Sequence, residues 1–262
     1  MCLISFQWQP KAATPLVLVA NRDEFYARPT QALHRWDDGI VAGKDLLGGG
    51  TWLGLHQPSG RLAALTNYRA PALMRDGTPS RGGIVTAFLR GTASAQDFAA
   101  ALAQQAGAYN PFNLLVYDGR ELVAFESRHA ALFLPKPGIW AVSNADFNTP
   151  WPKVQRLRAG FATALQGHDA APSPMLSPAL ESALWPLLGD TRVANDTDLP
   201  RTGIALERER ALSAEFIRTP DYGTRCSTVL QHSRSRVDII ERSFDARGDI
   251  GTVRLALEGL TP

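Results

Sequence analysis

The sequence predicts an α+β fold in which helices cover two stacked antiparallel β-sheets. Strand-like segments occur at both ends of the chain, and segments with helical spacing occur in two pairs between them. A further group of strand-like segments separates the two helical pairs. Strands from both ends are therefore expected to share one sheet system, with the helices packed outside it. No internal repeat or linker divides the chain, so we expect a single domain over residues 1–262.

The first strands are predicted from short runs rich in β-branched, aromatic and other apolar residues. Residues 2–8 and 15–22 form such runs around the turn sequence QPKAATP, which predicts a hairpin. Residues 26–45 contain proline, an Asp-Asp-Gly sequence and glycine, and we expect them to be irregular. A further apolar run at residues 61–68 predicts another strand, which ends on asparagine and tyrosine.

Three consecutive glycines at 48–50 precede a strand predicted to continue to residue 55. A phosphate-binding loop would continue with Gly-Lys-Ser/Thr and open a helix, and this segment does neither. We therefore attribute the glycines to a close backbone approach or a tight turn.

The helical pairs are predicted from apolar residues spaced three and four positions apart. The predicted helices are residues 80–90, 94–105, 152–165 and 178–188, with Ser94 as the N-cap of the second. The remaining predicted strands are residues 112–117, 122–126, 139–144, 224–231, 237–244 and 253–257. The last three are spaced as an antiparallel meander.

Composition excludes several classes of function. The 262-residue chain has a net charge of +2, 45% apolar residues and 20% charged residues, which is ordinary for a globular protein and gives no polyanion-binding pattern. We therefore expect neither nucleic acid nor a membrane surface as a partner. No apolar run approaches the roughly 20 residues that a membrane helix needs. The N-terminus lacks the pattern of a signal peptide, so we expect a cytoplasmic protein.

Only two cysteines, Cys2 and Cys226, occur in the chain. Two cysteines so far apart predict neither a disulfide framework nor a zinc site, so we expect no structural metal. Cys2 is notable because a side chain this small permits removal of Met1. The new first residue would carry a thiol and a free α-amine, whose unperturbed pKa values are about 8.5 and 7.7–8.0. One residue would then supply both a nucleophile and its base.

Polar residues end several predicted strands and could complete a site around Cys2. Acyl transfer by cysteine needs a base, a positive charge that favours the thiolate, and donors for the oxyanion. The α-amine could be the base, and either Arg22 or Arg225 the positive charge. Asn67 and Asn144 could be the donors, with Asp23 holding the ammonium or an arginine. Cysteines and strand-end charges also occur without such a role, so this interpretation requires that the fold brings these residues together.

The sequence resembles the NRDE family, known in animals as the transport and Golgi organisation family. The resemblance rests on Met1-Cys2 and on blocks at residues 20–25 (ANRDEF), 49–54 (GGTWLG), 65–69 (LTNYR), 80–82 (SRG), 109–113 (YNPFN), 143–144 (SN) and 222–225 (YGTR). These blocks extend over most of the chain in the family's order.

More distantly, the pattern is similar to the cysteine N-terminal-nucleophile (Ntn) hydrolases, which include bile-salt hydrolase and penicillin V acylase. This resemblance implies a four-layer αββα sandwich with Cys2 as the nucleophile. It also implies catalytic roles for Arg22, Asp23, Asn67, Asn144 and Arg225. In those hydrolases two residues separate the arginine from the aspartate, whereas here they are adjacent. Adjacent strand residues point to opposite faces, so a bulge or turn is needed for both to face Cys2.

The resemblance implies two classes of function. The first is hydrolysis of an amide or acyl thioester by Cys2, which requires no cofactor. The second is a non-catalytic carrier of haem or an acyl lipid, such as acyl-CoA, on the same fold. Both predict a small-molecule or acyl-chain ligand. Haem needs an axial ligand, and the candidates include Cys2, His34, His56, Met74, His129, Cys226 and His232. No Cys-x-x-Cys-His sequence is present, so any haem would be bound non-covalently.

Overall fold

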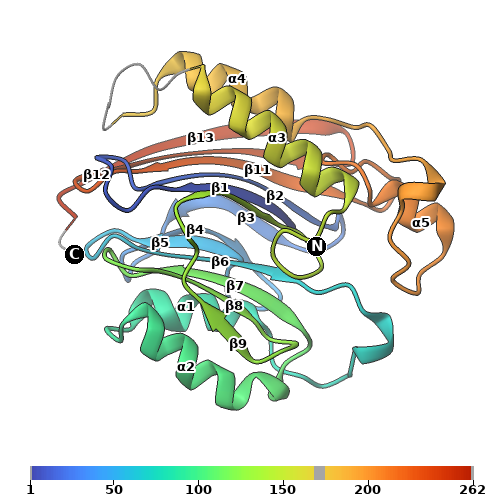
Figure 1. The fold of residues 1–262 in the computed structure, drawn as a ribbon, viewed down its shortest axis with the longest axis horizontal. Coiled ribbons are helices and arrows are strands. Elements are labelled where there is room, and N and C mark those ends of the chain that lie inside the picture. The colour runs from blue at the N-terminus through green and yellow to red at the C-terminus, as the bar shows by residue number, and fades with distance from the viewer. Residues whose placement is uncertain (1, 168–174, 261–262) are drawn as a thin grey trace.

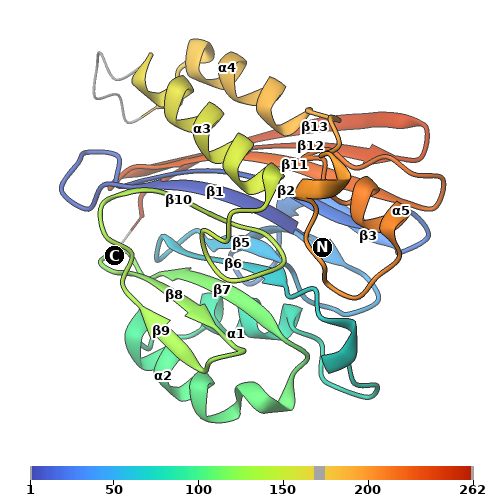
Figure 2. The same cartoon turned by 45° about the vertical axis from the view of Figure 1, so that its right-hand side comes forward.

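A computed structural model describes residues 2–167 and 175–260 and shows two antiparallel β-sheets stacked face to face (Figure 1). Helices α3 (Pro152–Gln166) and α4 (Pro178–Leu188) cover the outer face of the first sheet. Helices α1 (Gly82–Arg90) and α2 (Ala95–Gln105) cover the outer face of the second (Figure 2). The order of layers is helix, sheet, sheet, helix, which confirms the predicted α+β sandwich.

The first sheet contains strands from both ends of the chain. In spatial order its strands are β10 (Gly138–Val142), β1 (Cys2–Trp8), β2 (Leu16–Phe25), β11 (Tyr222–His232), β12 (Arg236–Asp245) and β13 (Gly248–Glu258). The N-terminal hairpin therefore lies between the C-terminal meander and β10. Strands from both ends of the chain share one sheet, as predicted.

The second sheet is built from one continuous part of the chain. Its strands lie side by side in sequence order: β3 (Thr30–Arg35), β4 (Ile40–Asp45), β5 (Leu53–His56), β6 (Arg61–Asn67), β7 (Phe112–Tyr117), β8 (Leu122–Glu126) and β9 (Ala131–Phe133). The prediction that residues 26–45 are irregular was wrong, because β3 and β4 occupy most of this segment. Strand β9 and the short helix α5 (Leu206–Ala211) were not predicted.

Three apolar clusters hold the four layers together. Alternate residues of the strands, such as Ile4, Phe6 and Leu115, pack between the two sheets. Phe88 of α1 and its neighbours pack against the second sheet, and Phe161 of α3 packs against the first. Alternation places neighbouring strand residues in different clusters, which is why both faces of each sheet are apolar. Among the described residues, no helix is long and apolar enough to cross a bilayer.

The predicted helix and strand boundaries of the other elements agree with the structure to within a few residues. Ser94 is the N-cap of α2, because its hydroxyl accepts a hydrogen bond from the Asp97 N–H at 3.0 Å. The glycines at 48–50 also behave as predicted. Gly49 has a φ of +71°, and a Cβ on Gly50 would lie only 2.5 Å from the carbonyl carbon of Gly82. The start of α1 therefore lies directly against this turn.

This close contact predicts that Gly50→Ala destabilises the fold. The added methyl group has no space, and overpacking of this kind costs about 1–3 kcal/mol. Gly107→Ala is the matched control, because nothing lies within 4 Å of its Cβ position and its φ is not positive. Urea unfolding of both variants would measure the effect. Equal free energies of unfolding for the two variants would contradict the proposed contact.

Candidate active site

A row of three side chains crosses the inner face of the first sheet. Cys2 begins β1 and pairs with Arg22 on β2, which in turn pairs with Cys226 on β11. Residues directly opposite each other on antiparallel strands project to the same face. Ile4 and Phe6, which alternate with Cys2 along β1, belong to the cluster between the sheets. The row therefore faces the second sheet.

These three residues border a cavity of about 490 Å³ at one end of the sandwich. Asn67 and the Gly50–Gly82 contact lie in the same lining. The lining contains many basic and acidic side chains. The basic ones are Arg22, Arg28, Lys44, Arg75, Arg81 and Arg225. The acidic ones are Asp23, Glu24, Asp45, Asp76 and Glu241. The cavity is therefore suited to a polar molecule or to the polar end of a larger one.

Arg22 brings a positive charge next to Cys2. Its side chain is buried, and its Nη2 lies 3.6 Å from Asp45 Oδ2 and 3.8 Å from Glu24 Oε2. Its Nη1 is buried without a hydrogen-bond partner among the described residues. An unsatisfied buried donor costs about 1–3 kcal/mol. Because Arg22 borders the cavity, an oxygen of a bound molecule could satisfy this donor.

The Cys2 thiol is protonated at neutral pH in this environment. Burial raises its pKa to about 11, although nearby positive charges, including Arg22, oppose the shift. A thiolate is the reactive form of cysteine. Cys2 therefore requires a base before it can act as a nucleophile. Met1, whose removal would expose the α-amine, lies outside the described residues.

Asp23 belongs to a second polar group on the other side of the strand. Its Oδ1 accepts a hydrogen bond from the Thr224 hydroxyl at 2.8 Å. The positive charge of Lys153, at the start of α3, acts on the same carboxylate. Lys153 is fully buried, which lowers its pKa to about 8, and its Nζ has no hydrogen-bond partner among the described residues. Of the two adjacent residues, Arg22 projects from the same face of the sheet as Cys2, as strand alternation predicts. Asp23 projects from the other face, although it also borders the cavity.

Arg225 borders the cavity, but its guanidinium hydrogen-bonds backbone carbonyl oxygens and not the Cys2 thiol. It is the extra residue of a β-bulge, because Thr224 pairs with Asp23 whereas Cys226 pairs with Arg22. Its Nη1 donates to the carbonyl oxygens of Phe25 and Arg28 at 3.0 Å each, and its Nε donates to the carbonyl of Phe244. These contacts fix the connection between β2 and β3. The structure places Arg225 in the lining with Cys2, but these hydrogen bonds give it a structural role.

The two asparagines lie at the ends of strands from different sheets. Asn67 ends β6 and borders the cavity, whereas Asn144 follows β10, is fully buried and is not part of the lining. The Asn144 amide donates to the backbone oxygen of Asn67 at 2.8 Å. The preceding Ser143 donates its hydroxyl hydrogen to the carbonyl of Cys2 at 3.0 Å. Ser143 and Asn144 together therefore connect the start of β1 to the end of β6, and one of the two amide hydrogens of Asn144 is engaged in this connection.

Three further residues belong to this site. Arg81 and Glu241 were not predicted, and Cys226 was predicted only as a possible haem ligand. Arg81 at the start of α1 lies close enough to Cys2 for its guanidinium to interact electrostatically with the sulfur. The Cys226 thiol hydrogen-bonds Glu241 of β12, and burial raises the pKa of both groups. Glu241 also accepts a hydrogen bond from the Leu33 N–H at 2.6 Å. Glu241 therefore connects the inner face of the first sheet to β3 of the second.

The possible haem ligands are spread over the molecule. Cys2 and Cys226 line the cavity, but none of the histidines and not Met74 is part of its described lining. His232 is buried, and both its ring nitrogens hydrogen-bond backbone oxygens, those of Gly60 and Ser233. Within the part of the chain that the structure describes, a ligand in this cavity would have only thiols available as soft axial ligands.

Comparison with known proteins supports the predicted resemblance. The family model of Transport and Golgi organisation 2 matches residues 1–246. The chain belongs to this family. It is 34% identical to the bovine (Bos taurus) Transport and Golgi organization protein 2 homolog and 31% identical to the human one (Homo sapiens), and each alignment covers 93% of both chains. All residues of the Cys2–Arg22–Cys226 row lie within the matched range.

Two solved structures were compared with the fold. A Caenorhabditis elegans N-acylethanolamine-hydrolyzing acid amidase ortholog superposes with a TM-score of 0.48 at 12% identity, covering 88% of this chain and 92% of that one. Eukaryotic HslV from Trypanosoma brucei superposes with a TM-score of 0.35 at 13% identity, covering 72% of this chain and 91% of that one.

The raised pKa of Cys2 predicts how its reactivity depends on pH when Met1 is retained. With a pKa of about 11, only roughly one thiol in three thousand is ionised at pH 7.5. Iodoacetamide labelling of Cys2, followed by peptide mass spectrometry, should therefore accelerate about tenfold per pH unit between pH 7 and 10. A chain with an N-terminal extension keeps the α-amine away from the thiol for this measurement.

Arg22→Gln should slow this labelling at every pH, because loss of the positive charge raises the thiol pKa further. Arg192→Gln is the control, because the Arg192 guanidinium is exposed and pairs with Asp190 outside the cavity. A labelling rate that levels off near pH 8.5 would show that burial does not raise the pKa of the Cys2 thiol. Equal rates in the two variants would show that the charge of Arg22 does not affect this pKa.

Proposed function

We propose that this protein is a cysteine hydrolase of the Ntn type that cleaves an amide or an acyl thioester. The observation that carries the proposal is the position of Cys2. It is the first residue of a central strand, its side chain lies in the wall of a polar cavity, and a buried arginine is its cross-strand partner. Removal of Met1 would place a free α-amine on the same residue, which supplies the base that the protonated thiol lacks.

In the proposed first step the α-amine of Cys2 takes the thiol proton, and the sulfur forms a bond to the substrate carbonyl carbon. The carbonyl π electrons move to the oxygen. The proposed donors for this oxyanion are Arg22 Nη1 and the Asn67 side chain, which both border the cavity. The tetrahedral intermediate then collapses and breaks the C–N or C–S bond. The leaving amine or thiolate takes the proton from the α-ammonium and departs, which leaves Cys2 acylated.

In the second step water attacks the acyl-Cys2 thioester with the α-amine again as base. The C–S bond breaks, the carboxylic acid leaves, and the thiol regains its proton. Asp23 is proposed to hold the α-ammonium from the side of the strand opposite to Arg22. Its negative charge raises the pKa of the α-amine, whereas the positive charge of Lys153 lowers it. In this mechanism, Arg22 on one face of the end of β2 stabilises the oxyanion, and Asp23 on the other face holds the α-ammonium.

The test is hydrolysis by material whose intact mass shows that Met1 has been removed. N-acyl amino acids, penicillin V and acyl-CoA thioesters are the substrates to screen. Cys2→Ala should abolish turnover, and Asn67→Ala should reduce it about 10²–10³-fold, as expected for loss of one oxyanion donor. Turnover should rise with pH through the α-amine pKa, near 7–8 before perturbation.

Cys226→Ala is the matched control, because it removes the other thiol in the same cavity wall. It should keep turnover within about tenfold of the wild type. Retention of Met1 in a host with normal methionine processing, or equal turnover by wild type and Cys2→Ala, would contradict the hydrolase proposal.

The second candidate function is a carrier of haem or of an acyl lipid. The observation that favours it is the presence of two thiols, Cys2 and Cys226, in a cavity with several arginines that could bind carboxylates or phosphates. Haemin titration followed by the Soret band should then show one equivalent bound without chemical change. Cys2→Ala or Cys226→Ala should shift the band, whereas His34→Ala should not. An equal spectrum in all three variants would indicate adsorption and exclude a cysteine-ligated haem.

A further inference from the structure

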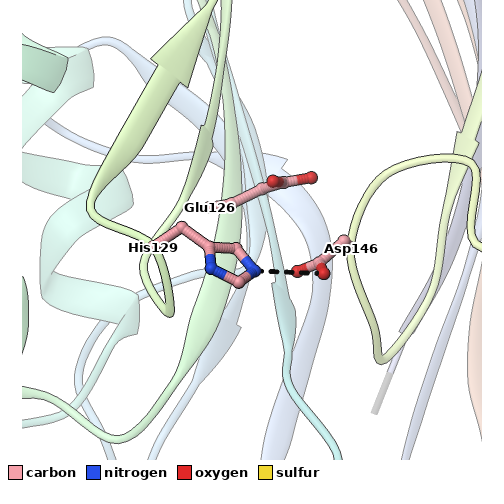
Figure 3. Close-up of side chains that lie close together, drawn as sticks. All are labelled: Glu126, His129 and Asp146. Atoms are coloured by element: carbon pink, nitrogen blue, oxygen red, sulfur yellow. Dashed lines mark hydrogen bonds and ion pairs between the residues drawn. The ribbon is translucent and has the colours of Figure 1, made fainter.

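A second group of titratable side chains lies outside the Cys2 cavity (Figure 3). Glu126 ends β8, His129 lies in the turn that leads to β9, and Asp146 lies in the connection between β10 and α3. One ligand atom from each lies within 4.8 Å of the others. His129 Nε2 is 3.2 Å from Asp146 Oδ2. Two segments of the chain thus bring two carboxylates and an imidazole together.

A buried amide next to this group also has an unsatisfied oxygen. Asn113 of β7 pairs directly with Glu126, so the two side chains project from the same face of the sheet. Asn113 is 1% exposed, and its Nδ2 donates to the carbonyl of Ala145, the residue before Asp146. Its Oδ1 has no hydrogen-bond partner among the described residues, and neither has Asp146 Oδ1. One unsatisfied oxygen therefore belongs to Asp146 of the group, and the other to the cross-strand partner of Glu126.

Backbone contacts hold the group in place. Glu126 Oε1 accepts a hydrogen bond from the Phe147 N–H at 2.8 Å. The backbone oxygen of Asp146 accepts hydrogen bonds from both the N–H and the hydroxyl of Thr149. Arg128, in the same turn as His129, lies over the ring of Tyr68 at 5.0 Å. The carboxylates are thus fixed close to each other by contacts that do not neutralise their charge.

We propose that Glu126, His129 and Asp146 bind a divalent transition cation such as Mn²⁺ or Zn²⁺, with Asn113 Oδ1 as a fourth donor. Carboxylate, amide and imidazole groups suit these ions. Ligands on opposite sides of an ion at about 2.0–2.4 Å lie no more than about 4.8 Å apart, so only small side-chain adjustments are needed. The sequence predicted no structural metal, because two distant cysteines do not form a zinc site. The site proposed here contains neither cysteine.

The proposed ion would link the β8–β9 hairpin of the second sheet to the connection that leads from β10 of the first sheet to α3. Lys153 and the β10 strand end with Asn144 flank this connection. None of the four proposed ligands is part of the described lining of the Cys2 cavity. The role inferred for the cation is therefore to join the two sheets near the site, and not to take part in the chemistry at Cys2.

Titration of the intact chain with Mn²⁺ alone, followed by electron paramagnetic resonance of the free ion, tests this proposal. Mn²⁺ prefers oxygen and nitrogen donors, so the thiols do not compete. The wild type should bind one ion per chain. Glu126→Gln, His129→Ala and Asp146→Asn should each weaken binding at least tenfold. His34→Ala is the control for loss of a partly exposed imidazole outside the group and should bind as the wild type does.

Thermal unfolding provides a second readout that does not depend on activity. Mn²⁺ should raise the unfolding midpoint of the wild type and of His34→Ala, and should not raise that of Asp146→Asn. Midpoints measured without metal show whether each variant is folded. Absence of stoichiometric binding to the wild type would overturn the proposal. Equal affinities in the ligand variants and the control would also overturn it, because binding would then be adventitious.

Discussion

The structure around Cys2 depends on burying the positive charge of Arg22 between two β-sheets. A buried guanidinium is costly unless charged and polar groups surround it. Asp45 lies 3.6 Å from it and is also held by Arg28 at 2.8 Å, while Glu24 lies 3.8 Å away. These acidic groups come from both sheets. The need to compensate Arg22 therefore keeps the sheets apart at this end and maintains a polar cavity where the rest of the interface is apolar.

The β-bulge at Arg225 determines which side chains meet Cys2. Without the extra residue in β11, regular antiparallel pairing would place Arg225 instead of Cys226 opposite Arg22. With it, Thr224 holds Asp23 on one side of the strand, while Cys226 extends the row of Cys2 and Arg22 on the other. Arg225 itself then fixes the β2–β3 connection through backbone oxygens. A single inserted residue thus places a thiol, and not a second guanidinium, opposite Arg22.

Much of the fold was predictable because most strands and helices bury one continuous apolar face. Strand β3 was missed because Leu33 is its only buried side chain, and an edge strand of this kind carries no apolar alternation. Glu241 could have been found, since it continues the inward-facing series of Val237 and Ile239 along β12. Lys153 could not, because its burial depends on how α3 lies on the sheet, which local sequence does not determine.

The central claim is that Cys2 forms a covalent acyl intermediate in the wall of this cavity. Intact mass spectrometry of the processed chain, quenched in acid shortly after mixing with an activated acyl thioester, tests it most directly. The account predicts one added acyl group per chain, located on the N-terminal peptide and absent from Cys2→Ala, while Cys226 stays unmodified. An adduct on Cys226, or no adduct on a chain whose Met1 has been removed, would contradict the account.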